Sequence, residues 1–552
     1  MTVTDRKLGC GHWKAPVADE GVLVQPPTDR WGAILSGNIQ YQKELRSRGG
    51  QLGEYDFQGR SFHALADQCR EEILQAALSY TRSYRDLSGD PGRWRSSNPL
   101  IFAGHQPDLL HPGVWAKNFA IDTFAASQGG IAINLLIDAD VPKSTSLKVP
   151  TGSAQQPILK NIALDHLPVP VSYENWKITE ESLFHSFGRR VATAIEPLVR
   201  DPWIDVYWQR VRERARSERG VGLCLAQARH QLEGEWGLST LELPQSHFCE
   251  TEAFRWFTAH LLAQLPRLHE IYNTSVAQYR RTYNLRSSTH PVSDLVEENG
   301  WLEAPFWIWD AQNPCRRRLL CRPQGDVLLL ADGLGLEIPL ALTPDGDADI
   351  AVSQLADASK SGIRIRTRAL MTTMFVRLLC GDIFVHGIGG GKYDQVTDSI
   401  IHRFFDIDPP EYMVLSGTLR LQVARPPAPA SSLGAINREL RDLKFNPDRF
   451  LSRNSGVTGS REWRGWVENK RHWVQTEQSI ENANTRHQEI TRSNEALQPF
   501  VADWSQQLRF QQKEATAQLR ADAILSARDY AFCLFPQSQL MHYMLDILPH
   551  WL

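Results

Sequence analysis

The sequence predicts an α/β protein with a parallel β-sheet core, a helical connecting region and a C-terminal helical hairpin. Three observations predict this fold class. Apolar runs of strand length alternate with helical segments near residues 98–165 and again within 326–425. Residues 166–325, between these two stretches, are mostly helix-forming, and residues 434–530, beyond a proline-rich linker, are polar and helix-forming. Alternation of strands and helices is typical of a sheet that is covered on both faces.

Length and charge exclude several classes of protein. The 552 residues exceed one compact core and indicate about two to four domains. Hydrophobic residues at 42% and charged residues at 22% exclude a disordered chain. With 60 basic and 63 acidic side chains, the formal charge of −3 gives no electrostatic case for binding nucleic acid or a membrane surface. We therefore expect neither partner.

The lack of an export signal, a membrane span and paired cysteines in the sequence predicts a cytoplasmic location. Residues 1–23 have no apolar run of signal-peptide length, and no apolar stretch of about 18 residues occurs elsewhere. The eight cysteines are scattered and form no C-x-x-C pair, which is typical of reduced thiols in a cytoplasm. Cys10-Gly11-His12 lacks a second metal-binding pair, so we interpret Cys10 as a free surface thiol and predict no metal site.

The first strand-helix-strand unit follows an N-terminal part of mixed, mostly helical character, residues 1–97. Residues 61–84 carry a helical apolar face, formed by Phe62, Leu65, Ile73, Leu74, Ala77 and Leu78. Residues 98–165 then show an apolar strand at 100–103, a helix at 114–126 and a second apolar strand at 131–137. These strands are continuously apolar, which favours a sheet buried on both faces.

The second α/β half, residues 326–425, follows the helical region. We predict strands at 326–330, 336–340, 383–386 and 412–421, helices at 367–379 and 395–405, and a glycine loop between 386 and 395. In the hairpin, residues 434–530, two sevenfold runs predict paired helices or a short antiparallel coiled coil: Trp466, Trp473 and Ile480, and Ile490, Leu497 and Trp504. The seam is thin, so a partner subunit or the main body should cover it. Residues 531–552 are expected to pack on the core.

The first candidate site follows the strand at 100–103. Gly104, His105 and Gln106 form a loop at the carboxyl end of this strand, where open parallel sheets bind ligands. The next helix should direct its N-terminal amides toward phosphate or carboxylate there, with Lys117 and Asn118 one turn inside it. The alternative is that His105 and Gln106 only satisfy backbone groups in a tight loop.

The second candidate site is the pair of carboxylates at the end of the next strand. Asp138 and Asp140 should lie beside the first loop, where they would hold a magnesium ion, orient an amine or sugar hydroxyl, or act as a base. The alternative is a cap of a helix or turn, which is a common role of aspartate after a strand.

The third candidate site is the glycine loop. Glycines allow backbone amides to approach a ligand closely, although the spacing matches neither a P-loop nor G-x-G-x-x-G. The loop contains His386, Gly387, Gly389, Gly390, Gly391, Lys392, Tyr393 and Asp394. The alternative is a plain turn. A further cluster, Trp307 and Trp309 with Arg316–Arg318, is interpreted as core tryptophans on a loop beside a solvated basic turn rather than an anion site.

The order of these motifs resembles the bacillithiol-biosynthesis cysteine-adding enzyme family, from about residue 40 to the C-terminus. Gly104-His105-Gln106 and Lys117 are similar to that family's Gly-Gln-Gln loop and the lysine of its next helix. Asp138-Ala139-Asp140 stands where the family has Glu-Asp-His-Asp, and Gly387–Gly391 where it has Gly-Gly-Pro-Gly-Glu. Cys533-Leu534-Phe535-Pro536 is similar to the Leu-Phe-Pro after the family's coiled coil.

The resemblance implies a Rossmann-like core, a coiled coil that pairs subunits into a homodimer, and a nucleotide site for ATP or ADP. It also implies a ligase that condenses cysteine with glucosaminyl-malate. Ala139 replaces the family's histidine, and the glycine loop lacks the family's Pro and Glu. Two alternatives therefore stay open: the enzyme uses another amine or acid as substrate, or the site binds a ligand without catalysis.

Three hypotheses follow for the function. In the first, a ligase acts on a small, sugar-derived substrate: Asp138 or Asp140 orients or deprotonates the attacking amine or thiol, His105 is an acid or base, and the glycine amides with Lys392 hold an anion. The second is a non-catalytic nucleotide- or sugar-binding scaffold, and the third is a nucleotidyl-transfer enzyme. A metal requirement stays open.

Overall fold

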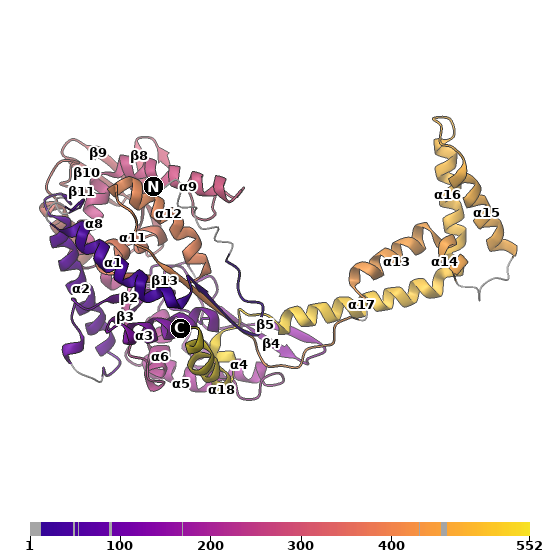
Figure 1. The fold of residues 1–552 in the computed structure, drawn as a ribbon, viewed down its shortest axis with the longest axis horizontal. Coiled ribbons are helices and arrows are strands. Elements are labelled where there is room, and N and C mark those ends of the chain that lie inside the picture. Colours follow the sequence, from indigo (N-terminus) through magenta and orange to yellow (C-terminus); the bar gives the residue numbers. More distant parts are fainter. Residues whose placement is uncertain are drawn as a thin grey trace. The chain divides into compact units, whose positions relative to one another are not determined.

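The computed structural model describes residues 13–47, 50–52, 55–87, 91–167, 169–429, 431–453 and 461–552 (Figure 1). Cys10-Gly11-His12 lies outside these described residues. The chain forms two compact units. Unit 1 comprises Met1–Val149, Asn161–Arg420 and Arg528–Leu552, and unit 2 comprises Pro150–Lys160 and Leu421–Ala527.

The main sheet of unit 1 is mixed, with a parallel centre and one antiparallel edge. Its strands lie in the order β1 (Glu20–Gln25), β14 (Met413–Leu419), β13 (Ile383–His386), β2 (Leu100–His105), β3 (Ile131–Leu136) and β6 (Leu241–Pro244). From β14 to β6 each neighbouring pair is parallel, whereas β1 runs antiparallel to β14. The expected strands at 100–103, 131–137, 383–386 and 412–421 are confirmed. The strands β1 and β6 were not predicted.

Helices cover both faces of this sheet. Leu100 and Phe102 of β2 point into the cluster that holds the apolar face of α2 (Phe62–Arg82). Side chains alternate along a strand, so Ile101, Ala103 and His105 point to the opposite face, against which α3 (Pro112–Ser127) packs. The predicted buried face of α2 is confirmed.

A second, antiparallel sheet in unit 1 lies in the order β11 (Glu337–Leu340), β10 (Val327–Ala331), β9 (Arg317–Gln324), β8 (Trp301–Trp309) and β12 (Arg364–Thr367), with β7 (Glu297–Glu298) beside β8. The strands expected at 326–330 and 336–340 therefore exist, but they belong to this sheet and not to the parallel one. Trp307 and Trp309 lie on β8, so their placement on a loop was wrong. The pairing of β8 with β12 joins segments far apart in the sequence, so it left no short-range signal.

Helices supply the rest of unit 1. A small β-hairpin of β4 (Ser146–Gly152) and β5 (Pro157–Ala163) is divided between the two units, since Pro150–Lys160 belongs to unit 2. The predicted helical region, 166–325, holds helices from Glu181 to Thr282, but β6 interrupts them and strands follow from residue 297. The α-helices not yet given are α1 (Trp31–Arg46), α4 (Glu181–Ile195), α5 (Ile204–Arg214), α6 (Val221–Glu235), α7 (Gln245–Phe248), α8 (Glu252–Ala263), α9 (Leu265–Thr282), α10 (Asp349–Lys360), α11 (Ala369–Phe375), α12 (Ile388–Phe405) and α18 (Gln537–Met541).

Short helical turns join these elements. They are η1 (Thr28–Arg30), η2 (Pro91–Arg93), η3 (Val376–Cys380), η6 (Phe532–Leu534), η7 (His542–Ile547) and η8 (Leu548–Trp551). The C-terminal segment, 531–552, packs on the core as expected. Phe532 lies 4.7 Å from Trp115 and 5.9 Å from Trp203 between ring centroids, so it completes an aromatic cluster against α3.

Unit 2 is built from helices around a thin apolar seam. Figure 1 labels α13 (Leu433–Phe445), α14 (Pro447–Arg453), α15 (Arg461–Gln475), α16 (Ala483–Leu497) and α17 (Ala502–Leu525); the turn η5 (Gln498–Val501) precedes α17. Helices α15 and α16 pack against each other, and so do α13 and α17. Leu497 is buried in the seam and Trp466 and Trp504 pack on it, whereas Ile480 is fully exposed in the loop between α15 and α16. The assignment of Ile480 to the seam was therefore wrong, because the helix ends before it.

The described residues contain no helix that is long and apolar enough to cross a membrane. Seven cysteines of the described part of the chain are unpaired: Cys69, Cys224, Cys249, Cys315, Cys321, Cys380 and Cys533.

Candidate functional site

The carboxyl edge of the parallel strands is the place where the chain order reverses. From β2 the chain proceeds to β3 and then β6 on one side, and later to β13 and β14 on the other. Val385 of β13 pairs with Ala103 of β2, which pairs with Asn134 of β3, so the three strands end at nearly the same level. Open α/β sheets bind ligands in the crevice at such a reversal. We call the edge around Gln106, Asp140 and Gly387 the switch-point crevice.

Gln106 and Asp140 meet at this edge. Gln106 follows β2 and donates from Nε2 to Asp140 Oδ2 at 2.9 Å. Arg316, which precedes β9, donates from one guanidinium nitrogen to Asp140 Oδ1 at 3.0 Å and to the carbonyl oxygen of Ala139 at 3.0 Å. The side chain of Asp140 is 38% exposed. A carboxylate that is fixed by two donors and still reached by solvent can bind or deprotonate a ligand.

Trp307 connects this cluster to the second sheet. Its ring lies between two guanidinium groups, with Arg316 at 4.5 Å and Arg368 at 4.1 Å from the ring centroid. Arg368 is held by Glu303, 2.6 Å from its NH2. Stacking of arginine on tryptophan fixes the position of its positive charge. Arg316 therefore stacks on Trp307 and pairs with the carboxylate of Asp140. It does not lie on the solvated basic turn that the sequence predicted.

The glycine run begins α12 rather than forming a loop, so the helix starts at Ile388 and not near residue 395. Gly387 is its N-cap and no side chain caps it. A Cβ atom on Gly387 or Gly389 would meet nothing within 4 Å, whereas one on Gly390 would lie 2.8 Å from His386 Nδ1 and one on Gly391 2.5 Å from Val414 Cγ2. Two glycines thus leave space at the helix N-terminus and two allow close packing.

Lys117 lies on the α3 side of the same edge. Its buried ammonium donates to the carbonyl oxygen of Gly104 at 2.5 Å, and burial lowers its pKa to about 8. The expectation that the α3 N-terminus faces this crevice was wrong. His111 caps it, accepting from Gly113 N at 3.1 Å, and Gly113 packs against Gly417 of β14, where a Cβ would clash with the backbone.

His105 and Asn118 belong to a buried polar network on the α3 face. His105 Nε2 lies 3.2 Å from Asn118 Oδ1 and 3.3 Å from a guanidinium nitrogen of Arg229. Arg229 also pairs with Glu233 and Glu242. Burial and then Arg229 lower the pKa of His105 well below its ordinary value, so the ring is neutral at pH 7. Burial raises the pKa of Glu242 to about 7.

His386 and Asp394 belong to a separate buried cluster on the opposite face. Because Val385 pairs with Ala103, His386 shares its face with Gly104 and not with His105. His386 Nε2 lies 3.0 Å from Asp394 Oδ2, which also binds Arg377 NH1 at 2.6 Å. Burial alone would raise the pKa of Asp394, but Arg377 and His386 hold it far below its ordinary value. The sheet therefore separates His386 from His105.

Of the remaining predicted site residues, Asp138 is buried, whereas Tyr393 and Lys392 are half-buried. Asp138 is fully buried and accepts from Ser246 N at 2.9 Å and from Ser246 Oγ at 2.5 Å, at the start of α7. It thus has the capping role that was its alternative. Tyr393 is half-buried, and burial, Asp394 and then Asp140 raise its pKa. Lys392, the fifth residue of α12, is half-buried in the second turn of the helix.

Sequence reasoning missed the partners that complete these clusters. Arg229 and Glu233 lie four residues apart on α6, and Glu242 interrupts the apolar strand β6. A helical Arg-Glu pair is usually a solvated surface pair, so its burial had no local signal. Among the described residues, no group of three or more His, Cys, Asp or Glu side chains is arranged to hold a metal ion.

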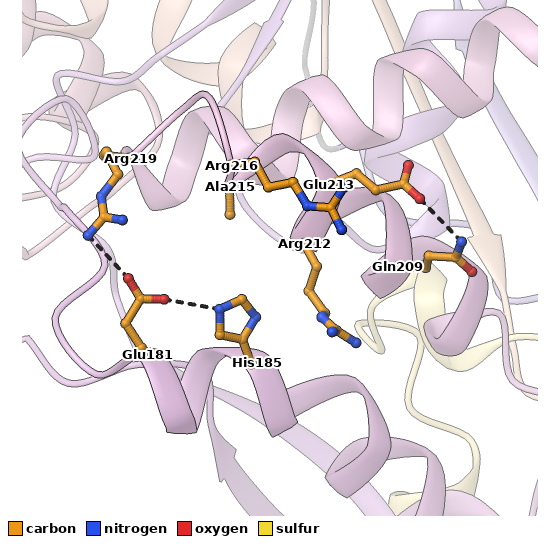
Figure 2. A pocket seen from close by; sticks show the side chains of 8 residues that line it. All are labelled: Glu181, His185, Gln209, Arg212, Glu213, Ala215, Arg216 and Arg219. Carbon is orange, nitrogen blue, oxygen red and sulfur yellow. Dashed lines mark hydrogen bonds and ion pairs between the residues drawn. The ribbon is translucent and has the colours of Figure 1, made fainter.

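A separate hollow of about 540 Å³ lies on the surface near α4 and α5 (Figure 2). Glu181 accepts from Arg219 at 3.1 Å and lies 3.0 Å from His185, and Gln209 donates to Glu213 at 3.2 Å. Figure 2 shows Arg212 beside them without a dashed contact. The arginines of this hollow are exposed, so it is a solvated surface and not the candidate site.

No family model matches this chain, and comparison with curated proteins found no match.

Proposed function

We propose that the chain is a ligase-like enzyme that condenses cysteine, or a similar amine or thiol, with a small sugar-derived anion in the switch-point crevice. One observation carries the proposal: Gln106 and Arg316 hold the accessible carboxylate of Asp140 where the chain order reverses, beside the uncapped start of α12. The order of motifs that resembles the bacillithiol-biosynthesis cysteine-adding family supports the reaction, with glucosaminyl-malate as that family's second substrate.

In this proposal Asp140 orients the attacking amine or thiol and takes its proton. Gln106 and Arg316 keep both carboxylate oxygens in place, so the base needs little reorganisation. His105 acts as a positioning residue, because its neutral ring is enclosed by Asn118 and Arg229. Asp138 likewise positions the end of β3 through Ser246.

Anionic groups would be held by three features of the same edge. Gly387 and Gly389 leave open space at the uncapped start of α12, Lys117 supplies a buried ammonium that donates to the carbonyl oxygen of Gly104, and Lys392 lies in the second helical turn. These residues fit the phosphates of ATP or ADP, which would activate a carboxyl group for condensation when bound. A nucleotidyl-transfer reaction would use the same phosphate groups.

The finer features of the fold belong to the same proposal. The parallel strands lie in the order β6-β3-β2-β13-β14, which follows the arrangement of a Rossmann-like sheet with an added antiparallel edge strand. We further propose that residues 460–520, which hold α15, α16 and most of α17, act as a coiled-coil hairpin that pairs two chains. The unpaired cysteines support a reducing, cytoplasmic location.

The test compares the two aspartates. Asp140→Asn should lower turnover of cysteine with glucosaminyl-malate, measured by mass spectrometry of the product, by about 10²- to 10⁴-fold. The matched variant Asp138→Asn should lower it far less, because Asp138 contacts Ser246 and not the crevice. Equal turnover of Asp140→Asn and the unmodified chain would refute this role of Asp140.

A binding measurement separates the enzyme from a non-catalytic scaffold. Thermal midpoints with ATP, ADP, cysteine or amino sugars should rise if the crevice binds them; saturation at about 100 times Kd stabilises by about 2.7 kcal/mol. Binding without any product formation would favour the scaffold. No response to any of these ligands would contradict both.

A further inference from the structure

A second polar pocket, of about 510 Å³, lies beyond the end of β6, between α7–α8 and α10–β12. Its lining includes Ser246, Arg255, Arg364 and Arg366, and it shares no lining residue with the switch-point crevice. Ser246 also binds Asp138, so the carboxylate at the end of β3 supports the wall of this pocket. We call it the α8–β12 pocket.

The charges of the α8–β12 pocket do not balance. Arg366 is buried and binds both carboxylate oxygens of Glu174, at 2.8 and 3.0 Å, and Glu250 Oε1 at 3.0 Å. Both carboxylates of the lining thus share Arg366. The lining as a whole carries four basic side chains, Arg255, Lys360, Arg364 and Arg366, against these two glutamates, so positive charge is in excess at the pocket.

Of these arginines, Arg364 makes a long ion pair with Glu174, and Arg255 pairs with no carboxylate among the described residues. Arg255 donates from NH1 to the carbonyl oxygen of Glu250 at 2.5 Å, and its buried Nε has no hydrogen-bond partner among the described residues. Arg364 donates to the carbonyl oxygen of Ser359 at 2.6 Å, and its Nε is 3.7 Å from Glu174. A guanidinium in this state has donors left for an anion.

A narrow recess continues from this pocket into the core. It has a volume of about 20 Å³ and is lined mainly by apolar side chains, including Phe254, Leu355 and Ile365. This volume admits about one water-sized group. Thr258 also lines the recess; it is 1% exposed, and its hydroxyl has no hydrogen-bond partner within the described parts of the chain.

We propose that the α8–β12 pocket binds a small organic carboxylate with a short apolar end. The carboxylate accepts from Arg255 and Arg364, and the apolar end enters the recess beside Phe254 and Thr258. An inorganic anion would leave the recess empty, and a purely apolar ligand would leave Arg255 unpaired. The proposal concerns a site separate from the crevice and does not rest on the ligase function.

The experiment titrates the full chain with sodium acetate, propionate and butyrate at constant ionic strength, and with inorganic phosphate, by calorimetry. We expect propionate to bind more tightly than acetate and phosphate, because its terminal methyl group fills the recess. Arg255→Gln should weaken propionate binding by about 10-fold or more, the loss expected for a charge-assisted hydrogen bond.

Two further variants keep the proposal falsifiable. Ala358→Val narrows the recess without changing charge, so it should weaken propionate but not acetate. Arg212→Gln removes an exposed arginine from the surface hollow of Figure 2 and should change neither. The proposal is overturned if no carboxylate binds at millimolar concentration, if Arg212→Gln weakens binding as much as Arg255→Gln, or if Ala358→Val has no effect. Circular dichroism checks that each variant is folded.

Discussion

Burial separates the two aspartates at the end of β3. Asp138 is enclosed and accepts two hydrogen bonds from Ser246, whereas Asp140 is partly exposed and pairs with Arg316. Burial, and then the charge of Glu174, raise the pKa of Asp138 to about 7. Two carboxylates two residues apart thus have different chemistry, because one caps a buried helix start and the other faces the crevice.

This difference predicts a pH-dependent stability. Between about pH 4 and about pH 7 the folded chain keeps a proton on Asp138 that the unfolded chain has lost, so stability from this group falls as pH rises through that interval. Asp138→Asn removes this titration. The urea midpoint of the unmodified chain should therefore fall relative to that of the variant between these two pH values.

Other carboxyl groups with a raised pKa do not affect this comparison, because both proteins contain them. Glu242, whose pKa burial raises to about 7, titrates equally in both proteins. Midpoint curves of Asp138→Asn and the unmodified chain that run parallel with pH would contradict the assignment.

At the residue scale, the sequence predicted that Gln106 and Asp140 would be neighbours, because parallel strands end at one edge. It could not predict Arg316 as their partner, because Arg316 comes from the second sheet and no local pattern links it to β3. Nor could it show that His105 and His386 face opposite sides. That depends on strand register, and a shift of one residue reverses the face.

At the element scale, the start of α12 shows why glycines recur there. Gly391 packs closely, and its added Cβ would lie 2.5 Å from Val414 Cγ2 and 2.8 Å from Trp13 Cζ3. Gly389 has open space. Gly391→Ala should therefore destabilise by about 1–3 kcal/mol through overpacking, while Gly389→Ala should be neutral or stabilise by up to about 1 kcal/mol.

Thermal or urea unfolding of the two alanine variants checks this prediction, with each serving as the control for the other. The substitutions are chemically identical and lie two residues apart in the same helix turn. Equal midpoints would show that the close packing of α12 on β14 is not required for stability.

Strand prediction succeeded where both faces of a strand are buried. β2, β3 and β13 are short continuous apolar runs, and these are recognisable in the sequence. β6 is only four residues long and carries Glu242 against the buried Arg229, so its sequence resembles an exposed segment. β1 is an antiparallel edge strand with one buried residue, Val22, which gives little signal.

At the scale of the whole molecule, unit 2 leaves large apolar side chains exposed to solvent. Its helices bury a seam that includes Ile436, Leu443 and Leu497. Phe510 on α17 remains 61% exposed and Ile480 is fully exposed. A partner subunit, as proposed for the hairpin, would remove this apolar surface from water.

Removing residues 460–520 would test the dimer only in part, because it would also expose the seam residues of α13. Substitution of Phe510 is a more specific test of the dimer than this deletion. If unit 2 pairs two chains through α17, Phe510→Asp should weaken the dimer by about 30-fold or more, the effect of losing an aromatic anchor. Light scattering over a concentration series measures this shift toward monomer.

The control for this experiment is Val206→Asp, which places the same charge on a residue of α5 in unit 1 that is 47% exposed. It should leave the dimer unchanged, because the proposed contact lies in unit 2. A monomeric unmodified chain at micromolar concentration, or a Phe510→Asp variant as dimeric as Val206→Asp, would contradict assembly through α17. Loss of the dimer in Phe510→Asp alone would establish that the exposed phenylalanine is an interface residue, because both variants carry the same added charge.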